Sequence, residues 1–131
     1  MKYLDANVFV IAAAQRDERG QQARAILHQI VRGESAVTSA LAFDEMMWTL
    51  SKQGQKDIIR PILENLYRIG HLEIRDVPGN IPLLALNLME ECRLKPRDAF
   101  HAAMMREWNI NEIVSDDADF DRVPGIKRVK I

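Results

Sequence analysis

The chain has 131 residues, of which 47% are hydrophobic and 28% are charged, and this size and composition predict one packed domain over residues 1–131. Collagen, coiled coil and low-complexity disorder are excluded, and uncharged stretches such as 35–43 and 77–89 are far shorter than the ~20 apolar residues of a membrane-spanning helix. The formal net charge of −1 gives no general attraction to nucleic acid, and the early charges of Lys2 and Asp5 argue against a signal peptide, so we expect a cytoplasmic protein.

The first half of the chain alternates short strand patterns with helical patterns. Residues 2–5 predict a strand, and the apolar run from Val8 to Ala14 predicts a helix whose cap is Asp5 or Asn7. The elements expected next are a helix over 17–33, a strand over 36–38, a helix over 40–51 capped by Ser39, and a helix over 56–69 that Pro61 kinks or restarts.

The second half continues the alternation. The expected elements are a strand over 72–77, a helix from Asn80 or Pro82 to about Arg93, a helix from about Arg97 to Trp108 behind Pro96, and strands over 112–115 and 127–131. Strands that alternate with helices predict an α/β fold with a mostly parallel sheet covered on both faces. Ligands of such sheets bind beyond the carboxyl ends of the strands, so residues that directly follow strands are the candidates for function.

Carboxylates occupy several of these positions. Asp5 ends the first strand pattern, a group of aspartates from Asp116 to Asp121 follows the fourth, and Asp98 lies in the first turn of the helix behind Pro96. Each has an ordinary structural explanation by itself, as a helix cap, a polar turn or a favourable charge at a helix start.

A further acid lies in the helix over 40–51. No charged residue stands three or four positions from Glu45, so no helical partner neutralises it, but the same is true of Asp44. Helical spacing therefore does not choose between these two.

Several carboxylates gathered at one sheet edge would raise one another's pKa values unless they shared a cation. A single cysteine, Cys92, and three scattered histidines give no zinc-ligand spacing, whereas carboxylate oxygens favour Mg²⁺ or Mn²⁺. Such sites serve mainly phosphoryl chemistry, so the residues indicate a metal-dependent phosphodiesterase or phosphatase.

Four motifs, in order, make the chain similar to the PIN-domain ribonucleases. Leu-Asp-Ala-Asn-Val at 4–8 resembles their first motif, and Ser-Ala-Leu-Ala-Phe-Asp-Glu at 39–45 resembles their second. Asp-Ala-Phe-His-Ala-Ala at 98–103 resembles the third, and Ser-Asp-Asp-Ala-Asp-Phe at 115–120 resembles the last, with Ser in place of Thr. Within the family the chain most resembles the VapC-type toxins, which implies a parallel five-stranded sheet with flanking helices and an acidic metal site.

The resemblance also implies roles for individual residues. It selects Glu45 over Asp44, and a shift of one residue in the last motif would exchange Asp116 for Asp117. The implied catalytic residues are Asp5, Glu45, Asp98 and Asp117. The implied metal ligands are Asp5, Asp98, Asp117 and Asp119. The implied supporting residues beside them are Asn7, Ser115 and Asp116.

The implied reaction is hydrolysis of an RNA phosphodiester by a water that the carboxylate-held Mg²⁺ or Mn²⁺ activates. Basic side chains must attract the RNA, and the candidates are Arg16, Arg97, Arg122 and Lys127. The family also implies an antitoxin partner and a homodimer. His101, three residues after Asp98, could face the site, but on a helix rich in Ala and Met we expect it to be a packing residue.

Three alternatives remain open. A haloacid-dehalogenase-like phosphatase also begins with an aspartate after strand one, but it requires a second Asp two residues later, where this chain has Asn7. A PIN domain that binds RNA or a partner without cleaving would be favoured by loss of a motif carboxylate, and all four are present. A standalone RNA-processing nuclease has the same residues as a toxin.

Overall fold

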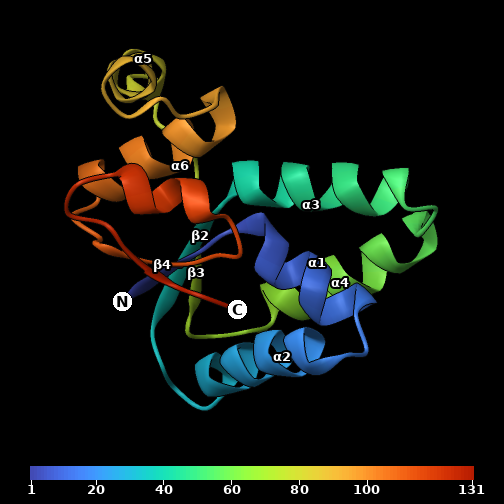
Figure 1. The fold of residues 1–131 in the computed structure, drawn as a ribbon. Helices are drawn as coiled ribbons and strands as arrows, with labels where there is room; N and C mark the ends of the chain where they lie inside the picture. The colour runs from blue at the N-terminus through green and yellow to red at the C-terminus, as the bar shows by residue number, and fades with distance from the viewer.

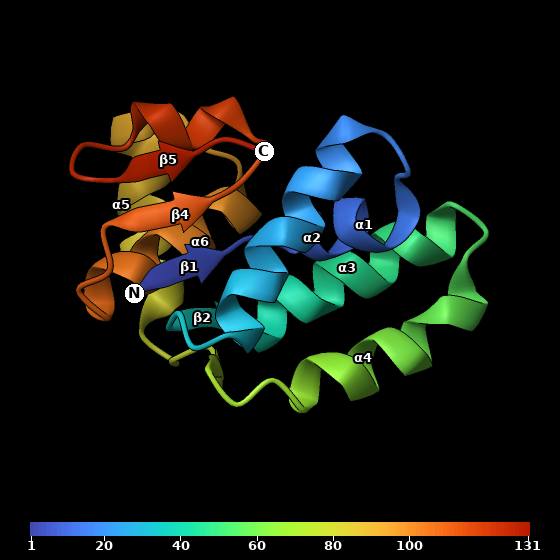
Figure 2. The ribbon, with the colours of Figure 1, turned by 90° about the horizontal axis from the view of Figure 1, so that it is seen from below.

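A parallel sheet of five strands in the order β3-β2-β1-β4-β5 forms the centre of the computed structural model, which describes residues 1–131. Figure 2 shows β5, β4, β1 and β2 side by side. The strands are β1 (Lys2–Leu4), β2 (Ala36–Ser39), β3 (Leu72–Arg75), β4 (Glu112–Val114) and β5 (Lys127–Val129). All neighbouring strands are parallel, which confirms the predicted α/β class.

Six α-helices and two short 3₁₀ helices connect the strands. They are α1 (Ala6–Ala14), α2 (Glu18–Val31), α3 (Ala40–Lys52), η1 (Lys56–Ile58), α4 (Ile59–Tyr67), α5 (Ile81–Cys92), α6 (Pro96–Glu107) and η2 (Ala118–Arg122). None of the helices combines the length and the apolar character needed to cross a bilayer.

Helices cover both faces of the sheet. Successive side chains of a strand point to opposite faces, so two neighbouring residues of β1 pack against different helices. Leu4 packs in a core formed with α1 to α4, whereas the preceding Tyr3 packs on the other face among residues of α6 and η2. Helix α5 packs against α6 on that second face, so these two helices lie apart from α2 (Figure 1). Both Tyr3 and Leu4 are completely buried, as expected for a central strand of a doubly covered sheet.

The first strand ends one residue earlier than predicted because the residue that follows it caps a helix. Asp5 has extended backbone angles and its Oδ1 accepts a 2.8 Å hydrogen bond from the Ala6 N–H, so Asp5 and not Asn7 caps α1. Ser39 ends β2 and, as predicted, caps α3, where its Oγ accepts from the Ala42 N–H at 3.2 Å.

Proline explains the one predicted helix that the structure divides. The segment expected as a helix over 56–69 begins as η1, and α4 starts at Ile59. Pro61 therefore lies in the first turn of α4, where its missing N–H costs no hydrogen bond. Of the two predicted outcomes, the restart of the helix is the one found.

Candidate active site

Asp5 lies at the centre of the carboxyl edge of the sheet and is 5% exposed. Its Oδ2 accepts hydrogen bonds from the Ser115 hydroxyl at 2.6 Å and from Asn7 Nδ2 at 3.1 Å. Burial raises the pKa of Asp5, and the charge of His101 and the Ser115 hydrogen bond only partly oppose this shift. The carboxylate is thus held in one orientation, in surroundings that favour a nearby positive charge.

Ser115 and Asn7 connect the ends of β1 and β4. The Ser115 Oγ accepts from Asn7 Nδ2 at 3.2 Å and from the backbone N–H of Asp117 at 3.0 Å. The Asn7 Oδ1 accepts from the backbone N–H of Asp116 at 3.2 Å. Asn7 and Ser115, both expected to orient acids, therefore do contact Asp5 and the backbone of the last motif.

A second acidic group surrounds Asp98 in the first turn of α6. Carboxylate oxygens of Asp98, Asp117 and Asp119 all lie within 4.8 Å of one another. Partial burial, followed by the negative charges of Asp117 and Asp5, raises the pKa of Asp98 to about 7. Like charges at such separations persist only when a proton or a cation compensates them.

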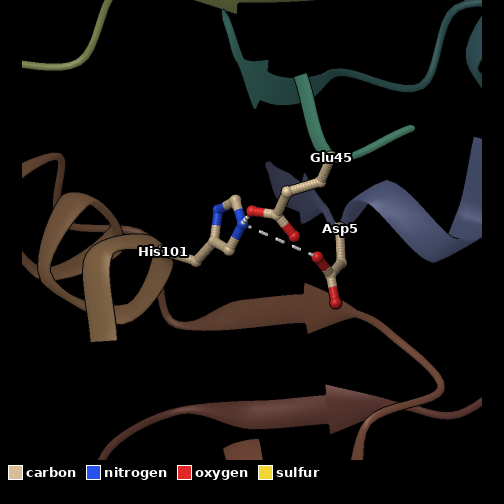
Figure 3. A group of neighbouring side chains, drawn as sticks. All are labelled: Asp5, Glu45 and His101. Atoms are coloured by element: carbon tan, nitrogen blue, oxygen red, sulfur yellow. Dashed lines mark hydrogen bonds and ion pairs between the residues drawn. The ribbon is translucent and has the colours of Figure 1, made fainter. Parts of the chain in front are cut away.

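His101 joins Glu45 to Asp5. Figure 3 shows its ring, which comes from α6, directed at both carboxylates. The Nε2 atom lies 2.5 Å from Glu45 Oε1 and 3.9 Å from Asp5 Oδ1, and the other ring nitrogen, Nδ1, lies 2.5 Å from the hydroxyl of Tyr3. Burial by itself lowers the pKa of His101, but the hydrogen bond to Glu45 and the neighbouring carboxylate charges outweigh it, so the pKa is raised.

The interpretation of His101 as a packing residue is therefore only half right. The side chain is fully buried on α6, yet its polar atoms face the acidic residues. Sequence reasoning also passed over Tyr3, whose burial raises its pKa well above the ordinary value. The available signal was a hydroxyl-bearing aromatic in the strand that directly precedes Asp5.

A cavity of about 440 Å³ opens beside the two acidic groups. Charged side chains dominate its lining, which consists of Glu45, Lys95, Pro96, Arg97, Asp98 and Asp117. A lining that contains both acidic and basic side chains suits a cation and a phosphate together. Arg97 was a candidate for RNA binding from the sequence, whereas Lys95 was not.

The structure separates the two neighbouring acids of the last motif. Asp117 lines the cavity, while the carboxylate of Asp116 is exposed and forms an ion pair with Arg19. Asp44 is exposed on α3, in contrast to Glu45.

The other basic candidates are not at the cavity. Arg122 forms an ion pair with Asp119 and donates a 2.8 Å hydrogen bond to the Arg93 carbonyl oxygen. Arg16 is exposed between α1 and α2. Lys127 lies beside Glu112 in the register of β4 and β5, where both strands begin, so it is at the end of the sheet opposite Asp5.

The donor set fits a divalent cation. Asp98 and Asp117 offer carboxylate oxygens to one space, with the buried Asp5 close enough to raise the pKa of Asp98. An all-oxygen set suits hard cations such as Mg²⁺ and Mn²⁺. His101 does not change this preference, because its Nε2 is already hydrogen-bonded to Glu45.

Comparison with known proteins gives the class of this fold and site. Residues 2–126 match the PIN domain family, and the chain belongs to that family. The resemblance inferred from the four motifs is thus confirmed.

Particular relatives are similar along nearly their whole length. The chain is 24% identical over 130 residues to the VapC ribonuclease Mb1869c of Mycobacterium bovis and to the ribonuclease VapC13 of Mycobacterium tuberculosis. Each alignment covers 98% of this chain and 99% of the relative.

Solved structures share the fold. VapC20 of M. tuberculosis, a sarcin-ricin loop cleaving toxin, superimposes with a TM-score of 0.78 at 14% identity and covers 92% of this chain and 93% of its own. VapBC2 of Rickettsia felis, bound to a DNA fragment from its promoter, has a TM-score of 0.75 at 19% identity, with 99% and 98% covered.

Proposed function

We propose that this protein is a Mg²⁺- or Mn²⁺-dependent endoribonuclease of the VapC type that acts as the toxin of a toxin–antitoxin pair. The observation that carries the proposal is a set of carboxylates that meet beside one cavity with basic side chains on its border. The carboxylates are those of Asp5, Glu45, Asp98 and Asp117, and the basic side chains are those of Lys95 and Arg97.

Three aspartates would hold the cation. Asp98 and Asp117 face a common space, and Asp5, fixed by Ser115, is close enough for its charge to raise the pKa of Asp98. Asp119 would be a further ligand after exchanging its ion pair with Arg122 for the cation. When bound, the cation supplies a Lewis acid that lowers the pKa of water and offsets negative charge on the attacked phosphate.

The remaining side chains would position RNA and water. Lys95 and Arg97 border the cavity and are exposed, so they can bind the phosphates that flank the scissile bond. Glu45 has one oxygen on His101 and no hydrogen-bond partner within the protein for the other, which leaves that oxygen to orient a water. No side chain need act as a nucleophile. We propose that the protein acts on RNA in the cytoplasm.

Relatives and solved structures support the toxin assignment. The curated relatives are named VapC ribonucleases, and the solved neighbours include VapBC complexes from Rickettsia felis and Salmonella typhimurium. We therefore include an antitoxin protein as the partner. A homodimer is the expected oligomer, with exposed apolar side chains such as Trp48, Leu83 and Leu86 available for contact.

The deciding experiment is cleavage of end-labelled single-stranded RNA by the purified chain with Mg²⁺, with Mn²⁺ or with EDTA. We expect metal-dependent cutting that a doubly substituted Asp5→Asn, Asp98→Asn variant lacks. Equal cutting by the variant would place the activity elsewhere or in a contaminant. The absence of cutting by folded wild type on total cellular RNA with either metal would favour a binding-only PIN domain.

The toxin assignment has its own test. Induced expression of the wild-type chain should arrest bacterial growth, whereas expression of the same double variant to the same level should not. Normal growth with active enzyme in the cell would favour a standalone RNA-processing nuclease.

A further inference from the structure

Three buried side chains form a polar chain that ends on Glu45. Tyr3, Ser39 and His101 are fully buried, although each carries polar atoms. The Tyr3 hydroxyl lies 2.8 Å from Ser39 Oγ and 2.5 Å from His101 Nδ1, and His101 Nε2 lies 2.5 Å from Glu45 Oε1. Four different elements, β1, β2, α6 and α3, supply these residues, so the tertiary fold assembles the chain.

The chemistry of the atoms fixes the direction of the last hydrogen bond. An ionised carboxylate only accepts, so the Nε2 of His101 must carry the hydrogen that Glu45 receives. A hydroxyl both donates and accepts, so Tyr3 can satisfy Nδ1 whether or not that nitrogen also carries a hydrogen. Ser39 can likewise donate to Tyr3 or accept from it. The arrangement thus directs an Nε2–H at Glu45 for either charge of the ring.

Packing prevents the imidazole from adopting another orientation. The ring centroid of Tyr3 lies 5.5 Å from that of His101 and 6.2 Å from that of Trp108. A ring flip would place carbon atoms opposite the Tyr3 hydroxyl and the Glu45 carboxylate, and two buried hydrogen bonds would be lost together. The imidazole is therefore rigid, whereas an unrestrained glutamate on a helix surface would sample several rotamers.

We propose that His101 is a positioning residue, whose Nε2–H, held in place by the hydroxyls of Tyr3 and Ser39, fixes the Glu45 carboxylate at the cavity. The inference rests on the proposed function in that Glu45 acts on the RNA or its attacking water. Precise placement matters because small displacements of a group near the reacting atoms have large effects on rate.

A matched pair of amide variants tests the role. In His101→Gln the side-chain amide reaches the place of Nε2 and can still donate to Glu45, whereas in His101→Asn it reaches only the place of Nδ1 near Tyr3. We expect His101→Asn to lower kcat by roughly 10- to 100-fold with little change in KM, and His101→Gln to recover most of that loss. Equal losses of kcat in two variants of equal Tm would overturn the proposal, because packing or proton transfer would then be the role of His101.

The hydroxyl of Tyr3 has a matched control. Tyr3→Phe should lower kcat in the same direction as His101→Asn, because it removes the partner of Nδ1. Tyr67→Phe should have no effect, since Tyr67 is 64% exposed on α4. An unchanged kcat in Tyr3→Phe would contradict the part assigned to this hydroxyl.

A measurement without RNA separates failure of this inference from failure of the proposed function. Urea unfolding of His101→Asn, Glu45→Ala and the double variant in EDTA forms a double-mutant cycle. We expect strong non-additivity, because Glu45→Ala leaves the buried Nε2–H of His101 without its partner, a cost that disappears when His101 is also replaced. Additive effects would overturn the contact itself, even if the wild-type chain cleaves RNA.

Discussion

The hydroxyl of Ser115 donates a 2.6 Å hydrogen bond to the Oδ2 of Asp5, a residue 110 positions away in the sequence. The bond connects the end of β4 to the end of β1 and fixes the most buried carboxylate of the site. The aspartate proposed as a cation ligand is thereby kept in one orientation before a cation binds.

Ser115→Ala tests this relationship. Loss of an orienting hydrogen bond to a ligand typically lowers metal affinity by roughly 10- to 100-fold, so we expect a higher Mn²⁺ concentration for half-maximal cleavage in Ser115→Ala. The control is Ser35→Ala, at an exposed position before β2. A Mn²⁺ dependence equal to that of wild type would show that Asp5 is oriented by its other partners.

Glu45 and Asp44 form a pair of adjacent acids with different environments. Glu45 contacts His101, while Asp44 is exposed on α3. Glu45→Gln should reduce kcat by at least about 100-fold, as expected for a group that acts on the attacking water, and Asp44→Asn should leave it within about twofold. Cleavage of labelled RNA at saturating Mn²⁺ measures both. The reverse result would mean that the second motif has been read one residue out of place.

Asp117 and Asp116 provide a similar comparison in the last motif. Asp117 lines the cavity with Asp98, whereas Asp116 pairs with Arg19. Asp117→Asn should abolish detectable cleavage because it removes a proposed ligand. Asp116→Asn should retain activity and lose little stability, since exposed ion pairs contribute ~0–1 kcal/mol. Loss of activity in Asp116→Asn with a normal Tm would exchange the two roles.

The raised pKa of Asp98 predicts how stability depends on pH in EDTA. Its pKa is about 7 in the folded protein against an ordinary value of 3.8, so the folded state binds the proton more tightly than the unfolded state does. The stabilisation from this group is complete below about pH 4 and is lost as the pH rises through about 7. Asp98→Asn removes the charge, so its Tm in EDTA should exceed that of wild type at pH 8 and converge with it near pH 4.

Mn²⁺ should stabilise wild type more than Asp98→Asn. A cation that binds the native state stabilises it, and wild type offers one more carboxylate than Asp98→Asn does. We expect Mn²⁺ at pH 8 to raise the Tm of wild type by more than that of the variant in differential scanning fluorimetry. Equal shifts would remove Asp98 from the cation site.

The basic border of the cavity predicts a salt effect on RNA binding. Lys95 and Arg97 border the cavity, whereas Lys127 starts β5 at the opposite sheet edge. In the cleavage-deficient Asp5→Asn, Asp98→Asn background, each phosphate contact removed should reduce the slope of log K against log salt by about 0.7 for single-stranded RNA. Lys95→Gln and Arg97→Gln should show this reduction, and Lys127→Gln should not. A uniform effect of all three would indicate a general electrostatic attraction instead.

The order of strands and helices could be predicted from the sequence because it depends on local properties. Apolar spacing identified the helices, and Ser39 was recognised as a cap because a serine before an apolar helix satisfies free N–H groups in any fold. Asp5 and the aspartates from Asp116 to Asp121 were found in a similar way, since ligands of α/β sheets gather where strands end. The resemblance to the PIN-domain family, and not spacing, selected Glu45 and completed the set of four motifs. The exact ends of the elements were less certain. The sequence left open whether Asp5 or Asn7 caps α1 and whether Pro61 kinks or restarts a helix, and the backbone angles of the folded chain decide both.

Tertiary structure alone decided which of these residues face one another. Asp116 and Asp117 are chemically identical and adjacent, and only the backbone path after β4 sends one to Arg19 and the other to Asp98. His101 was expected to be a packing residue because its helix is rich in Ala and Met. Its partners, Tyr3 and Glu45, lie 98 and 56 residues away, so no local pattern records them. The sequence by itself therefore predicts the helices, the strands and the residues capable of acid or ligand chemistry. The contacts between distant residues, which only the folded chain forms, decide which of these residues make up the site.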